Sequence, residues 1–120
     1  MERRTFLRGS IGFALAALAP SGIALAAASG DHVAQAIDQI NKAIPYGEEP
    51  AHSSSFVQHI DNAIDHAVMA RKAHAGPHVS RAILYLRRAR RIAYGTHLLS
   101  YSRRGASLAK KALAQLQAAQ

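Results

Sequence analysis

Apolar residues recur at intervals of three and four along four stretches of the chain, and glycine or proline separates each stretch from the next. This spacing places the apolar side chains on one face of an α-helix. The clearest stretch begins at residue 77, and its apolar positions are Val79, Ala82, Ile83, Leu86, Ala89 and Ala93. No stretch alternates apolar and polar residues as a half-buried strand does. The sequence therefore predicts an all-α protein.

The four predicted helices occupy about residues 33–44, 55–75, 77–93 and 98–116. Pro45, Gly47 and Pro50 are expected to end the first helix, and Ser55 with Gln58 forms a capping box for the second. Gly105 is expected to weaken the fourth helix, since glycine costs about 1 kcal/mol relative to alanine there. Short connections between helices of similar length predict an up-down-up-down four-helix bundle, which we place at residues 31–118.

Two short stretches, residues 32–37 and 78–83, share the pattern His-Val-x-x-Ala-Ile and lie 46 positions apart. Each is followed by a Tyr-Gly pair and then by a further histidine, His52 in the first half and His97 in the second. Self-similarity of this kind is typical of a duplicated unit. We therefore expect the bundle to consist of two duplicated helical hairpins.

Residues 1–26 have the features of an export signal. The sequence Arg-Arg-Thr-Phe-Leu at residues 3–7 resembles the twin-arginine motif, and an Ala-rich apolar run at residues 11–25 follows it. This run is interrupted by proline and glycine and is short for a membrane span of about 20 apolar residues. We expect cleavage after Ala26 or Ala28 and a soluble protein in the periplasm.

Charge divides the chain after residue 26 into two halves. Its six acidic residues all lie between positions 31 and 65, whereas nine Lys and Arg and no acid follow from Arg81 onward. Opposite charges favour packing of the two halves against each other or against another copy. Arg90 falls inside the apolar arc of its helix, where an unpaired charge would be costly. We expect it to extend outward or to pair with an acid of the first half, namely Asp38, Asp61 or Asp65.

All seven histidines lie between positions 32 and 97 and are candidate metal ligands: His32, His52, His59, His66, His74, His78 and His97. Three of them follow one another at seven-residue intervals. Because seven residues of an α-helix return to within about 20° of the starting direction, His59 and His66 share one stripe at the edge of the buried face. His52 precedes the helix and is expected on the loop.

Folding into a bundle is expected to gather the histidines at its two ends. One end would hold three histidines and a carboxylate, His32, His74, His78 and Asp31. The other would hold two histidines and two carboxylates, His52, His97, Glu48 and Glu49, with His59 one to two turns inside. Neutral imidazole binds Cu(II), Ni(II) and Zn(II), and carboxylates can complete the coordination shell; the absence of cysteine excludes thiolate sites. The alternative is that these histidines only cap helix ends and fill boundary positions.

The pattern resembles a known family, the histidine-rich four-helix bundles among the small metal-binding proteins of the bacterial periplasm. The register His-x6-His-x6-His of residues 52–66 matches the family repeat, as do the two His-Val openings and the glycines at positions 47 and 95. The resemblance implies reversible binding of Cu(II) and other divalent metals, for buffering or delivery.

The sequence also departs from this register, because several positions that the family fills with histidine hold other residues. Steps of seven and fourteen from His32, His78 and His97 reach Gln39, Tyr46, Tyr85, Ile92, Arg104 and Lys111. Only the second predicted helix keeps a full histidine series, which implies either a lower metal capacity or loss of the metal function altogether.

The basic second half suggests a different function, a non-enzymatic interaction module that binds an acidic protein or anionic lipid headgroups. Nucleic acid is not an expected partner of an exported protein. An enzyme is not expected either, because the sequence has no Ser/His/Asp ordering, no glycine-rich phosphate loop and no Glu-x-x-His pair of the di-iron bundles.

Overall fold

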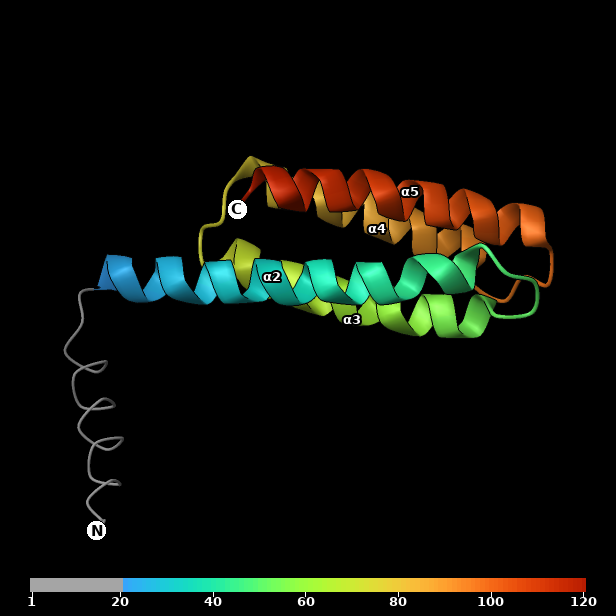
Figure 1. Ribbon diagram of the computed structural model, residues 1–120. Helices are drawn as coiled ribbons and strands as arrows, with labels where there is room; N and C mark the ends of the chain where they lie inside the picture. The colour runs from blue at the N-terminus through green and yellow to red at the C-terminus, as the bar shows by residue number, and fades with distance from the viewer. Residues whose placement is uncertain (1–20) are drawn as a thin grey trace, which may run out of the picture.

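The computed structural model describes residues 21–120, with side chains from residue 28 onward (Figure 1). Its four helices are α2 (Ser21–Gly47), α3 (Ser53–Lys72), α4 (Pro77–Ala93) and α5 (Leu99–Ala118). Most of the predicted signal segment, residues 1–20, lies outside the described part of the chain. The first turns of α2 extend past the other three helices.

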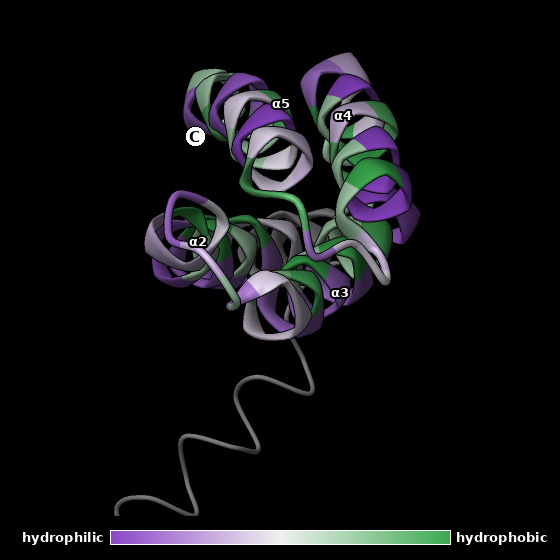
Figure 2. Cartoon of the chain, turned by 90° about the vertical axis from the view of Figure 1, so that its right-hand side faces the viewer, coloured by the Kyte–Doolittle hydropathy of each residue, from purple (hydrophilic) through white to green (hydrophobic). Residues whose placement is uncertain are grey.

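The helices form two antiparallel hairpins, α2 with α3 and α4 with α5, and one hairpin packs on the other. Each helix packs mainly on two neighbours, so that α2, α3, α4 and α5 close into a ring around one core, and α3 also meets α5 across that core (Figure 2). The predicted up-down-up-down four-helix bundle is confirmed. Among residues 21–120, no helix combines the length and the apolar content that a membrane crossing requires.

The core consists mainly of small side chains. Among residues 28–120, eleven of the twenty buried apolar residues are alanine, which lets the helix backbones approach closely and leaves few large side chains to fill the remaining space. The largest of these is Phe56, which is 0% exposed. All six apolar positions predicted for α4 are buried, because the whole stripe of that helix faces the other three.

Two predicted helix starts are wrong, and the predicted end of the first helix is right only in part. α2 begins at Ser21 instead of near residue 33. Pro45 does not end α2, which continues to Gly47; a proline so near the end removes one backbone donor, and the Glu48 amide still donates to the carbonyl oxygens of Ile44 and Pro45. The start of α3 lies at Ser53, and no side chain caps it. The capping box predicted at residues 55–58 therefore does not form, because both of its members lie inside the helix.

The start of α4 agrees with its prediction. Pro77 occupies the beginning of the helix, where its missing N–H leaves no hydrogen bond unmade. Gly76 precedes it with φ of 98°, a conformation that glycine adopts without steric cost.

Gly105 was expected to weaken α5, and the structure instead gives it a packing role. A Cβ atom at this position would lie 3.1 Å from Phe56 Cε2 and 3.2 Å from the carbonyl oxygen of Ala89. The glycine therefore permits close contact of α5 with α3 and α4. Its cost in helix propensity is offset by the packing that this contact allows.

The two hairpins bury equivalent positions, which supports the predicted duplication. Adding 46 to the buried apolar positions of α2 (33, 36, 40 and 43) gives buried positions of α4. For α3 and α5 the offset is 49, which carries positions 56, 57, 60, 63 and 67 onto buried positions of α5. By this register the equivalent of His52 is Tyr101, and His97 is not its counterpart.

Arg90 joins the two hairpins. Its Nε donates a hydrogen bond to Oδ1 of Asp61, and its guanidinium lies 4.9 Å from the ring centroid of Tyr94. The two charged side chains are 41% and 43% exposed, so that both remain partly hydrated. The prediction that Arg90 pairs with an acid of the first half is confirmed.

Candidate functional site

Three pairs of polar or aromatic side chains line the outer seam between α2 and α3. They are His32 with His66, Gln39 with His59, and Tyr46 with His52. Along this series the residue number rises by seven on α2 and falls by seven on α3. Seven residues are close to two helical turns, so antiparallel helices bring such positions together in reverse order. We call these six residues the α2–α3 seam.

The pair at one end of the seam consists of two imidazole rings in direct contact. Nδ1 of His32 lies 3.2 Å from Nδ1 of His66, and the ring centroids are 5.5 Å apart at an interplanar angle of 29°. Nitrogen atoms at this separation share a hydrogen bond when one ring is protonated at Nδ1 and the other is not. Both side chains are half-buried, so they are held in place and still reach solvent.

In the middle of the seam, His59 is oriented by two residues of α2. Its Nδ1 lies 2.9 Å from Oε1 of Gln39, and since an amide oxygen can only accept, Nδ1 carries the proton. The lone pair of neutral His59 is therefore on Nε2. The ring of Tyr46 stacks on His59 at 5.7 Å with an interplanar angle of 7°. A ring nitrogen that donates to a carbonyl-type oxygen is the arrangement that orients histidine ligands in metal sites.

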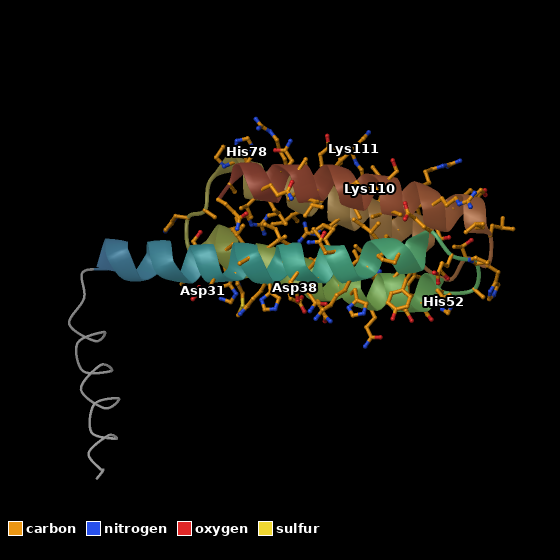
Figure 3. All side chains as sticks on the ribbon, in the orientation of Figure 1. Asp31, Asp38, His52, His78, Lys110 and Lys111 are labelled. Carbon is orange, nitrogen blue, oxygen red and sulfur yellow. The ribbon has the colours of Figure 1, made fainter. Side chains whose placement is uncertain are left out.

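The other predicted ligands are separated from one another. His52 is exposed, with its Nε2 3.8 Å from Oε1 of Glu49. His78 donates from Nδ1 to Oε1 of Gln115 at 2.8 Å, at the opposite end of the bundle from His52 (Figure 3). His97 is exposed in the α4–α5 turn, beside a hollow of about 600 Å³ that extends to the start of α3.

The predicted gathering of three histidines at one end is not formed. His32 turns sideways to His66 on the seam, His78 turns to Gln115, and His74 is exposed in a turn where its φ is 65°. Residues 21–120 contain no group of three or more histidine and carboxylate side chains that could hold a metal ion. The imidazoles point in different directions because each one pairs sideways within its own hairpin, His32 across α2 and α3 and His78 across α4 and α5.

At the other end, the two predicted carboxylates have separate partners. Oε2 of Glu48 accepts a hydrogen bond from Nζ of Lys110 at 2.7 Å, which leaves only Glu49 beside His52. The residues that sequence reasoning missed are Gln39 and Tyr46, which contact the seam histidines His59 and His52, and Gln115, the partner of His78. The seven-residue spacing could have identified two of them, since Gln39 and Tyr46 stand seven and fourteen positions after His32. In the register of the family repeat, however, both are only positions where a histidine ligand is missing.

The second hairpin repeats this seam with different chemistry. The pair of His78 with Gln115 is equivalent to that of His32 with His66, by the offsets of 46 and 49. By the same offsets, Tyr85 and Leu108 are equivalent to Gln39 and His59. Ile92 and Tyr101 are equivalent to Tyr46 and His52. The α4–α5 seam is therefore mainly apolar where the α2–α3 seam carries histidines.

Known proteins offer no template for assigning this site. No protein-family model, no curated protein and no solved structure matches the chain.

Proposed function

We propose that the protein binds a divalent transition metal, Cu(II) first with Ni(II) and Zn(II) as alternatives, through His32 and His66. The observation that supports this is the 3.2 Å separation of their Nδ1 atoms. Two imidazole nitrogens at about 2.0–2.1 Å from one ion lie about 2.9–3.4 Å apart when they subtend a right or tetrahedral angle. The metal would take the place of the proton that the two rings share, without displacement of either helix.

Two protein ligands give a weak and exchangeable site. Structural zinc sites use four protein ligands and catalytic ones three, so an ion held by His32 and His66 keeps positions for water or for a ligand from a partner. Such binding suits buffering or delivery of metal better than permanent storage. His59, with Nε2 free and Nδ1 anchored on Gln39, supplies a separate single ligand on the same seam.

We expect a double substitution, His32→Ala with His66→Ala, to weaken Cu(II) binding more than about tenfold, which corresponds to about 1.4 kcal/mol. Calorimetric titration of Cu(II), Ni(II) and Zn(II) into the protein near neutral pH measures the change. The matched control is His74→Ala with His97→Ala, which removes two exposed imidazoles and leaves the seam intact. Its affinity should equal that of the unaltered protein.

The same titration is expected to weaken as the pH falls from about 7 to about 5, since protons compete with the metal for imidazole. If the control pair weakens binding as much as the seam pair, the ion binds exposed histidines in general. An unaltered protein that takes up no metal would refute the proposed function itself.

We also propose that residues 1–26 direct export to the periplasm, with cleavage after Ala26 or Ala28. Replacement of Arg3 and Arg4 by lysine should retain the chain in the cytoplasm, because the motif depends on the arginine pair. Cell fractionation followed by mass spectrometry measures both location and the mature N-terminus. Processing should leave the bundle intact, because the first buried apolar residue among residues 28–120 is Val33. A full-length mass in the periplasmic fraction would contradict the predicted cleavage.

A further inference from the structure

The α4–α5 hairpin carries an excess of positive charge that the protein does not neutralise. Seven of its cationic side chains are exposed and form no ion pair with an acid of residues 28–120: Arg81, Arg87, Arg88, Arg91, Arg103, Arg104 and Lys111. The other two, Arg90 and Lys110, pair with Asp61 and Glu48 of the first half. The sequence contains no acidic residue after Asp65. We call the seven exposed cations the basic face.

The basic face points away from the core on both helices. At about 100° per residue, Arg81, Arg88 and Arg91 fall within about 80° of each other on the side of α4 opposite its buried stripe. The three cations of α5 fall within about 100° on its outer side by the same geometry. Figure 3 shows Lys111 on the side of α5 away from the first hairpin. Two neighbouring helices thus present their cations outward together.

Apolar side chains lie among these cations. Leu84 is 56% exposed, and on its helix it is one turn from both Arg81 and Arg88. Tyr101 is 41% exposed and belongs to the apolar α4–α5 seam. The equivalent positions of the first hairpin form the polar α2–α3 seam. The first hairpin has one comparable exposed side chain, Met69, which is 50% exposed, but it shares α3 with Asp61 and Asp65. The second hairpin combines exposed apolar side chains with cations and contains no acid.

We propose that the basic face docks on an anionic lipid surface. Cations attract acidic headgroups, and exposed apolar side chains between them enter the headgroup region. Single-stranded nucleic acid is a poorer fit, because it needs free aromatic rings for base stacking. Here Arg104 lies 5.3 Å from the ring centroid of Tyr101, and Arg90 lies 4.9 Å from that of Tyr94, so that a guanidinium already occupies one face of each ring. A protein docked in this way keeps the α2–α3 seam on the side away from the lipid.

Vesicle flotation tests the proposal, with vesicles of phosphatidylcholine alone and of phosphatidylcholine mixed with phosphatidylglycerol. The apolar run at residues 11–25 can hold the full chain on any vesicle, so the quantity to compare is the ratio of anionic to neutral binding. We expect this ratio to exceed one clearly. It should fall towards one as salt rises from about 0.1 M to about 1 M, where the Debye length shortens from about 10 Å to about 3 Å.

The decisive variant is Arg81→Gln with Arg88→Gln and Arg91→Gln. At roughly fivefold per cation near an anionic surface, it should lower the ratio more than about tenfold. The matched control removes the same charge from the first hairpin, as Lys42→Gln with Arg71→Gln and Lys72→Gln, all exposed. The control should change the ratio of anionic to neutral binding by less than about fivefold, which is the effect of one cation at the lipid surface. Circular dichroism verifies that both variants fold.

A third variant, Leu84→Ser, is expected to reduce binding and leave its salt dependence unchanged, as loss of an inserted apolar group would. Equal losses in the two triple variants would overturn the proposal, since overall charge would then explain binding. Equal binding to neutral and anionic vesicles would overturn it as well. The proposal would also be overturned if the protein bound polyglutamate or single-stranded DNA tightly and did not bind anionic vesicles. The partner of the basic face would then be an acidic macromolecule.

Discussion

Replacement of Phe56 by alanine is expected to lower the free energy of unfolding by about 3–5 kcal/mol. The ring is fully buried and lies against residues that have little or no side chain. Cβ atoms added at Gly47 and Gly105 would meet it at 2.8 Å and 3.1 Å. Small neighbours cannot extend into the space that the ring leaves, so most of the cavity would persist. A domain of this size has only about 5–15 kcal/mol of stability in total.

Urea unfolding followed by circular dichroism measures this loss, with an unchanged dependence on denaturant as the sign that the native fold is kept. The control is Leu84→Ala, which truncates an exposed side chain and should change stability by less than about 0.5 kcal/mol. A loss below about 1 kcal/mol at Phe56 would show that the helices collapse into the cavity. The ring would then not be what holds α2, α3 and α5 at their spacing.

The second large effect is expected for Gly105→Leu, a loss of about 1–3 kcal/mol or more. A larger side chain here meets the carbonyl oxygen of Ala89 at 3.2 Å and Cβ of Ala93 at 3.4 Å, in addition to the Phe56 ring. The Ala89 oxygen belongs to the backbone of α4 and can move only if that helix moves. The substitution should therefore separate α5 from α4, with thermal unfolding as the measurement.

Gly105→Ala separates the two opposing contributions at this position. Alanine gains about 1 kcal/mol in helix propensity but crowds the Phe56 ring. In a Phe56→Leu background the Cε2 atom is gone, so the same change at Gly105 should be less costly or even stabilising. A double-mutant cycle measures this coupling. Additive effects would contradict the proposed contact between the two residues.

Much of the fold could be predicted because its signals are local. Four apolar stripes gave four helices, and the six positions predicted for α4 are all buried. Helix ends were predicted less well, since Pro45 lies within α2 and the residues of the expected capping box lie within α3. Helix ends depend on one or two hydrogen bonds, whereas a stripe sums many apolar contacts.

The candidate site was only partly predictable. The seven-residue interval correctly placed His59 and His66 at the edge of the buried face, where both are half-buried. It did not reveal that His66 meets His32, because that contact depends on the axial register between two helices. One turn of slippage would pair His66 with a different residue of α2 and leave no two imidazoles together.

The sequence by itself determined that this chain forms four amphipathic helices in two similar hairpins, that the second hairpin is basic, and that Arg90 must either extend outward or pair with an acid. Each of these follows from periodicity, composition or the cost of an unpaired charge, which act within a segment. Only the tertiary structure decided which histidines meet, which acid Arg90 pairs with, and why Gly105 is tolerated. Those outcomes depend on how far one helix slides and turns against another, which is set by the packing of Phe56 and the buried alanines of all four helices together.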